Sequence, residues 1–137
     1  MIKMNEHVKN VFNHEELDAE HDKIQWQLDA LKEIVETDFS EERFSKGIDS
    51  LMTMLEEHFG HEEFYMREKK YESIKFHTDQ HANLCTVVEE LHNKFKKNPS
   101  EAEAKIIFGF INEWLISHTI QADVIAGNFL KRRDREE

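Results

Sequence analysis

Apolar residues recur along most of the chain in alternating steps of three and four positions, the spacing of side chains on one face of an α-helix. Four stretches carry this pattern, and we expect helices over residues 17–37, 41–68, 73–96 and 99–127. Glycine and proline are sparse, with four and one in 137 residues, and no long run alternates polar with β-branched residues. The pattern therefore predicts an all-α fold.

Residues typical of helix ends mark the borders of these stretches. Ser40 is the expected N-cap of the second helix. For the fourth helix we expect Asn98 as the N-cap, Pro99 at the first helical position and Gly127 as the end, followed by a solvated basic tail over residues 131–133.

Four helices of similar length joined by short connections predict an up-down-up-down antiparallel four-helix bundle. At 137 residues the chain is long enough for one core and too short for two. We expect a single domain over residues 1–137, in which residues 1–16 form an N-terminal arm lying across the bundle.

The composition excludes several classes of partner. The formal net charge of −11 would repel nucleic acid and an anionic membrane surface. No stretch approaches the length of a membrane span, and residues 1–10 do not resemble a secretory signal. The single cysteine, Cys85, lies in an ordinary core stretch and cannot form an internal disulfide, so we expect a cytoplasmic protein.

Polar side chains occupy positions on the apolar faces where core residues are expected. A single inward histidine is most often a core residue with one hydrogen bond. Burying six such groups without partners would cost about 1–3 kcal/mol each, more than a small bundle tolerates. Metal coordination removes that cost. The six are His21, His58, Glu62, His77, His81 and His118.

The spacing of these residues supports a metal site. His58 and Glu62 are four residues apart, as are His77 and His81, so each pair lies on one face of its helix. Asp123 follows His118 by five residues, which places it about 140° away on a regular helix. Either the metal lies between these two side chains, or the helix is locally irregular with an i to i+5 turn. We expect both residues to be ligands and the helix to be irregular there.

The remaining histidines lie off the apolar faces, and we expect them to face solvent: His7, His14, His61 and His92. Tyr65 is either a hydrogen-bond donor to a metal ligand or a packing residue.

In this order and spacing the seven residues resemble the ligand signature of the hemerythrin family, in particular its single-domain bacterial members. The resemblance runs from about Leu17 to about Asp123 and includes Leu-Asp-Ala-Glu-His at the first ligand, His-Phe-x-x-Glu-Glu at the second pair and Trp-Leu-x-x-His in the fourth helix. The chain departs from the family's pattern at Phe12, where a tryptophan is common, and at Thr119, where an aliphatic residue is more usual.

The resemblance implies a diiron centre. His77, His81 and His118 would bind one iron and His21 and His58 the other, with Glu62, Asp123 and a solvent-derived oxo or hydroxo group bridging them. This ligand set leaves one coordination position open, on the iron with two histidines. Dioxygen would bind there reversibly, in a pocket for which the candidate residues are Leu115, Trp114, Thr119, Ile24 and Leu28.

The function expected from this resemblance is that of an oxygen carrier, store or supplier, which is not an enzyme. The alternatives are a sensor of oxygen or nitric oxide, and an iron-dependent repair or nitric oxide reductase enzyme. An appended signalling domain would favour the sensor. A site for a substrate or a redox partner would favour the enzyme. By ligand type alone, zinc suits the same residues.

Overall fold

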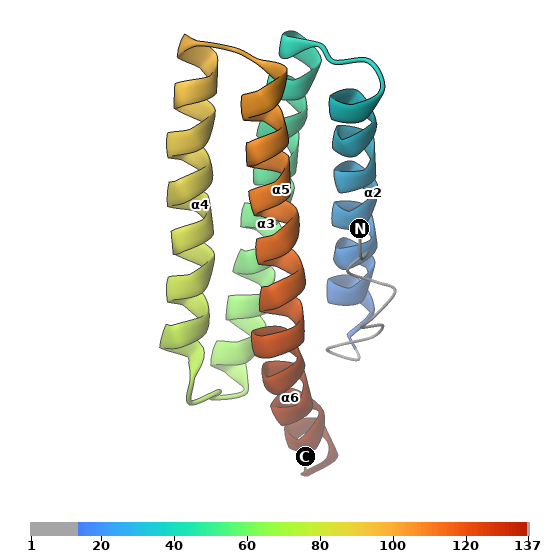
Figure 1. The fold of residues 1–137 in the computed structure, drawn as a ribbon. Helices are drawn as coiled ribbons and strands as arrows, with labels where there is room; N and C mark the ends of the chain where they lie inside the picture. The colour runs from blue at the N-terminus through green and yellow to red at the C-terminus, as the bar shows by residue number, and fades with distance from the viewer. Residues whose placement is uncertain (1–13, 137) are drawn as a thin grey trace.

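The structure, a computed structural model, describes residues 14–136. Four long helices lie side by side with neighbours antiparallel, which confirms the predicted bundle (Figure 1). Their bounds are Glu15–Glu36 (α2), Glu41–Glu68 (α3), Ile74–Lys97 (α4) and Glu101–His118 (α5). The last helix continues through a π-helical turn, Thr119–Asp123 (η1), into α6, Val124–Glu136. The expected N-terminal arm lies mostly outside the described residues, and α2 already begins at Glu15.

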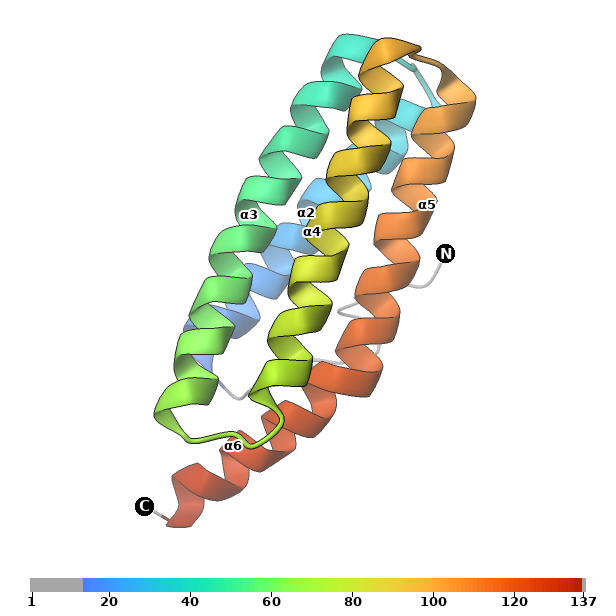
Figure 2. The same ribbon diagram turned by 90° about the vertical axis from the view of Figure 1, so that its left-hand side faces the viewer.

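The four helices form a closed ring of contacts, in which α2 packs on α3, α3 on α4, α4 on α5 and α5 back on α2 (Figure 2). The apolar faces meet along the axis of this ring, as the three-and-four spacing predicts, and Leu31, Leu51, Leu84 and Ile111 are among the side chains with no exposed surface. Within residues 14–136, no helix combines the length and apolar composition needed to cross a bilayer.

The caps of the helices are partly as predicted. The Ser40 side chain accepts a hydrogen bond from the backbone N–H of Arg43, as expected for an N-cap. The prediction for the last bundle helix is wrong, because Asn98 ends α4 and Ser100 caps α5 by accepting from Glu103 N–H. A proline disfavours helical geometry in the residue before it, which explains why α4 stops ahead of Pro99.

Gly127 does not end the last helix, contrary to the expectation, because that helix continues to Glu136. Ala126 and Leu130 flank this glycine and are fully buried against Leu17 and Met66 at the base of the bundle. Burial of these side chains outweighs the cost of about 1 kcal/mol for a glycine inside a helix. Residues 131–133, expected to form a solvated tail, therefore belong to α6, which extends below the bundle in Figure 1.

Candidate metal centre

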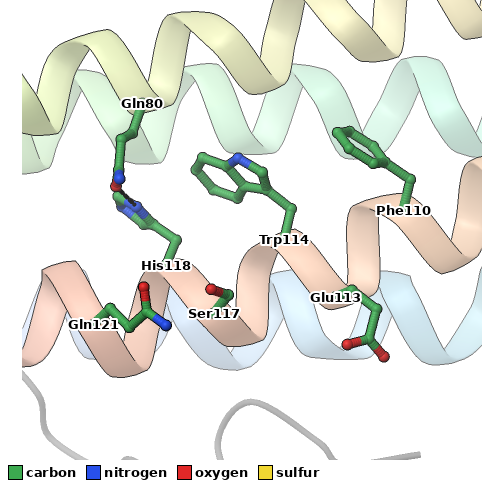
Figure 3. A pocket seen from close by; sticks show the side chains of 7 residues that line it. All are labelled: Gln80, Phe110, Glu113, Trp114, Ser117, His118 and Gln121. Atoms are coloured by element: carbon green, nitrogen blue, oxygen red, sulfur yellow. Dashed lines mark hydrogen bonds between the residues drawn. The ribbon is translucent and has the colours of Figure 1, made fainter.

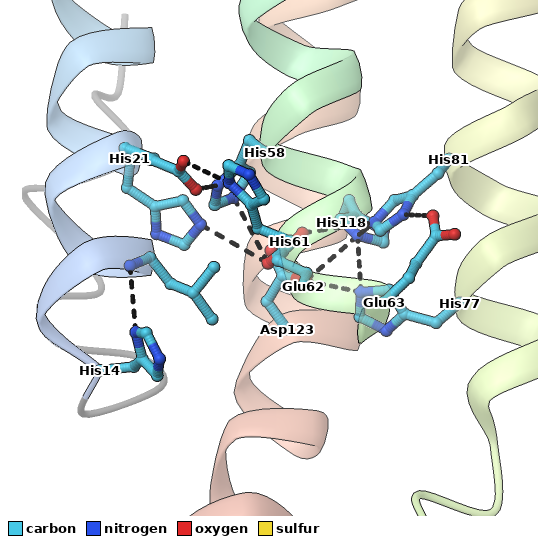
Figure 4. Close-up of polar contacts among 12 residues, drawn as sticks. His14, His21, His58, His61, Glu62, Glu63, His77, His81, His118 and Asp123 are labelled. Atoms are coloured by element: carbon cyan, nitrogen blue, oxygen red, sulfur yellow. Dashed lines mark hydrogen bonds and ion pairs between the residues drawn. The ribbon is translucent and has the colours of Figure 1, made fainter. Parts of the chain in front are cut away.

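All seven predicted site residues are buried and converge at one level of the bundle (Figure 4). They come from every bundle helix and from the π-helical turn. The structure gathers them into two groups whose potential ligand atoms lie within 4.8 Å of one another. The first group is His77, His81, His118 and Asp123, and the second is His21, His58 and Glu62.

The first group has the spacing of ligands around a common ion. His118 Nε2 lies 3.0 Å from His81 Nε2 and 3.2 Å from His77 Nε2, while Asp123 Oδ1 lies 2.8 Å from His77 Nε2 and 3.1 Å from His118 Nε2. Adjacent ligand atoms that are each about 2.1 Å from one ion are separated by about 3.0–3.4 Å. The donor atoms of this group therefore fit a metal ion without rearrangement of the helices.

The carboxylate of Glu62 faces both groups. One oxygen, Oε2, lies 3.4 Å from His58 Nε2 and 3.8 Å from His21 Nε2, whereas Oε1 lies 3.6 Å from His81 Nε2. Both oxygens and His58 Nε2 are fully buried and make no hydrogen bond. Buried groups of this kind are costly without a partner, and a cation between the two groups would supply one.

The local irregularity predicted between His118 and Asp123 is confirmed. Residues Thr119–Asp123 form a π-helix, the i to i+5 arrangement, and the chain resumes α-helical geometry at Val124. The wider turn brings the Asp123 carboxylate onto the same side as the His118 ring. Of the two alternatives that the spacing of His118 and Asp123 left open, the structure therefore has the locally irregular helix.

Three histidines of the centre form hydrogen bonds through Nδ1 with polar side chains that the sequence analysis did not predict. Glu20 Oε1 lies 2.9 Å from His58 Nδ1, and Glu63 Oε2 lies 2.8 Å from His81 Nδ1. Gln80 Oε1 accepts from His118 Nδ1 at 2.7 Å, as Figure 3 shows. Such bonds fix the orientation of a ring and turn Nε2 toward the centre.

A signal for these three residues was present in the sequence. Each lies directly next to a predicted ligand in the chain, Glu20 before His21, Glu63 after Glu62 and Gln80 before His81. A residue adjacent to an inward ligand on one helix points toward the neighbouring helix, where it can reach a ligand from that neighbour.

The charges of the centre are set by burial and by mutual pairing. Burial and the neighbouring Asp123 raise the pKa of Glu62, but His58 and His21 outweigh them and the pKa falls to about 2. Burial opposes a charge on His58 as well, yet Glu62 and Glu20 raise its pKa to about 10. Burial lowers the pKa of His81 to about 3, so this ring is neutral and its lone pair is available. A metal ion would displace the proton of His58 on binding.

Aromatic rings cover two of the imidazoles. Phe59 stacks on His81 with ring centroids 3.8 Å apart, and Trp114 stacks on His118 at 4.5 Å. Trp114 is only half-buried and lines a surface pocket of about 290 Å³ between α4 and α5, together with Gln80 and His118 (Figure 3). The other four residues expected to form an oxygen pocket are buried, namely Ile24, Leu28, Leu115 and Thr119.

The expectation that the remaining histidines face solvent is partly wrong. His92 is 5% exposed, and its Nε2 lies 2.8 Å from Ser45 Oγ. The core position in the last turns of α4 falls at residue 92 rather than at the neighbouring Leu91, which is only half-buried. His14 is half-buried and caps α2, His61 is exposed as expected, and His7 lies outside the described residues.

Tyr65 does not contact a metal ligand through its hydroxyl, which donates instead to Asp134 on α6 at 2.7 Å. Its ring lies at the base of the bundle, against the cluster that holds α6 in place. Of the two alternatives for Tyr65, a packing residue therefore fits better than a hydrogen-bond donor to a metal ligand.

The fold and these buried side chains define a helical-bundle protein with a centre suited to binding a metal cation. The family model described as "Hemerythrin HHE cation binding domain" matches residues 13–123. This protein belongs to the hemerythrin family.

Two curated relatives, both named bacteriohemerythrin, are similar to part of the chain. The protein of Methylococcus capsulatus (strain Bath) is 29% identical over 82 residues, which are 60% of this chain and 62% of the relative. That of Aquifex aeolicus is 32% identical over 84 residues, 60% of this chain and 63% of the relative. The chain thus spans less than two thirds of the length of either relative, and no solved structure matches it.

Proposed function

We propose that the buried centre holds two iron ions and binds dioxygen reversibly, as a non-catalytic oxygen carrier, store or supplier. The observation that carries this proposal is the position of Glu62, whose two carboxylate oxygens face separate histidine groups. One carboxylate shared in this way suits two ions a short distance apart better than one ion. In the proposed assignment His77, His81 and His118 serve one ion, His21 and His58 the other, and Asp123 is the second bridge.

A pair of ferrous ions would supply the two electrons that reversible binding of dioxygen requires. The residues of the chain perform the remaining tasks. Glu20, Glu63 and Gln80 hold three imidazole rings so that their Nε2 atoms point to the centre. The carboxylates of Glu62 and Asp123 neutralise part of the charge of the ions, and both are buried.

The surroundings of the centre favour release of the bound gas over its reaction. Ile24, Leu28 and Leu115 belong to the main apolar core of the bundle, and each is at most 3% exposed. An apolar wall of this kind limits the access of water, protons and reductants. The name that the two relatives share, bacteriohemerythrin, supports the same function.

Oxygen titration of the anaerobically reduced, iron-loaded protein tests this proposal. We expect one dioxygen per chain to bind with an optical change that reverses when oxygen is removed. Lasting oxidation after one exposure to oxygen, or turnover of oxygen by the reduced protein, would contradict it. A protein that holds zinc and shows no optical response would contradict it as well.

A further inference from the structure

A further cluster of ligand-type side chains lies on the surface, directly outside the buried centre. Glu16 and Glu20 are one turn apart on α2, and His61 faces them from α3. One potential ligand atom from each of these residues lies within 4.8 Å of the other two. None of the three belongs to the seven residues of the buried centre.

The distances within this cluster suit a metal ion. His61 Nδ1 lies 2.6 Å from Glu20 Oε2 and 3.9 Å from Glu16 Oε1. Ligand atoms that are each about 2.1 Å from one ion lie about 3.0–4.2 Å apart. The Glu16 distance is within this range, and the Glu20 contact, which is a hydrogen bond in the metal-free chain, would lengthen by about 0.4 Å as an ion replaces it. The Glu16 side chain is 68% exposed, so it can rotate to complete the site.

The chemistry of these donors favours a divalent transition-metal ion. An imidazole with two carboxylates suits zinc, manganese, iron or copper better than calcium, which takes oxygen ligands alone. His61 would bind through the lone pair of Nδ1 while its proton resides on Nε2, and water would complete the coordination.

The surface around Glu16 is acidic. Glu16 lines an open hollow of about 680 Å³ together with Glu15 and Asp134. Among residues 14–136, basic side chains near this surface include Lys69, which pairs with Asp134, and Lys23, which lines a smaller hollow beside Glu20. A concave acidic surface on a chain of net charge −11 raises the local concentration of cations.

The surface cluster is connected to the buried centre through Glu20. This carboxylate contacts His61 with Oε2 and His58 Nδ1 with Oε1, at 2.9 Å. Side-chain exposure falls from 68% at Glu16 through 49% at His61 and 19% at Glu20 to 3% at His58. Side chains of types that can bind a metal ion thus form a continuous series from solvent to the interior.

We propose that Glu16, Glu20 and His61 form a surface site for a divalent transition-metal cation, and that ions held there are passed on to the buried centre. The surface site stands on its own geometry, whereas the transfer rests on the proposed function, in which His58 is a ligand. Glu20 contacts both His61 of the surface site and His58 of the buried centre. An ion that leaves His61 while bound to Glu20 would therefore lie next to the Nδ1 side of the His58 ring.

Calorimetric titration with Zn²⁺ tests the surface site in protein whose buried centre is already filled with iron. We expect one additional Zn²⁺ per chain in the wild type, with the iron content unchanged. Glu16→Gln and His61→Ala should lose this binding. Glu89→Gln, an exposed acid on α4 with the same change of charge, should keep it. Glu20 is left intact because it also supports His58. Absence of extra binding, or equal binding by all variants, would overturn the site.

The rate of anaerobic Fe²⁺ uptake by the metal-free chain tests the transfer. Glu16→Gln and His61→Ala should fill the buried centre more slowly than wild type and Glu89→Gln, while reaching the same final iron content. Uptake at the wild-type rate would overturn the transfer. A wild-type chain that takes up no iron would overturn the proposed function instead, and Zn²⁺ binding that disappears in the two variants would still support the surface site.

Discussion

His118 Nε2 and Asp123 Oδ1 lie 3.1 Å apart although five residues separate them in the chain. The π-helical turn over Thr119–Asp123 makes this contact possible, since a regular α-helix would place the two side chains about 140° apart. The same oxygen of Asp123 lies 2.8 Å from His77 Nε2 on α4. The turn thus brings Asp123, at the end of the bundle's last helix, into contact with α4, the helix that packs beside it.

Replacement of Asp123 by asparagine should cost the protein bound metal. The substitution keeps the size of the side chain but removes one of two buried carboxylates that would balance the charge of the proposed cations. We expect fewer than two ions per chain after dialysis, as measured by elemental analysis. Asp134→Asn is the matched control, because Asp134 contacts Tyr65 and Lys69 and not the centre, and it should retain both ions. Two ions in Asp123→Asn would argue against a ligand role.

Replacement of Glu63 by glutamine should weaken metal binding without removing a ligand. The Glu63 carboxylate lies 2.8 Å from His81 Nδ1, where it orients the ring and increases the basicity of Nε2. We expect about a 10- to 100-fold loss of metal affinity in competition with a chelator. Glu56→Gln, an exposed acid on α3, should leave affinity unchanged. Equal affinity of both variants would mean that His81 needs no support.

The bundle and the inward position of the seven polar side chains could be predicted from the sequence because both depend on spacing within one helix. The buried residues of α2 are those of its predicted apolar face, His21 included, with Gln25 in addition. Features that depend on contacts between helices could not be predicted from the spacing within one helix. Glu20 and Gln80 contact His58 and His118 on neighbouring helices, and Gly127 lies within a helix because nearby residues pack on the base of the bundle.

Substitution of Lys70 by glycine should stabilise the fold. Lys70 has a φ of 58°, and the N–H groups of Lys70 and Tyr71 bond to the carbonyls of Arg67 and Met66, the Schellman arrangement that favours glycine. Relief of the left-handed conformation should add about 0.5–1 kcal/mol to the free energy of unfolding in urea.

Lys69→Gly is the comparison for this substitution. Lys69 has a φ of −90° and pairs with Asp134 at 3.0 Å, so glycine there should destabilise the protein. A decrease in stability for Lys70→Gly would contradict the argument.

The stability of the protein should depend on pH through His92. Burial lowers the pKa of His92, Lys96 lowers it further, and Asp49 opposes them. The unfolded chain takes up this proton near pH 6.5, whereas the folded chain takes it up only at lower pH. Protons therefore favour the unfolded state below about pH 6.5, and the stabilisation is complete above it.

His92→Gln removes this dependence while keeping a side chain able to bond to Ser45. In metal-free protein, the stability advantage of wild type over His92→Gln should shrink between pH 7.5 and pH 5.5, as measured by urea unfolding. An advantage that stays constant or grows would show that His92 is not buried in the neutral form.

The central claim is that seven buried side chains hold two iron ions side by side. Anomalous diffraction at the iron edge from crystals of the iron-loaded protein tests it most directly. We expect two peaks per chain, one bounded by His77, His81 and His118, the other by His21 and His58, with Glu62 in contact with both. A single peak, or none among these residues, would contradict it.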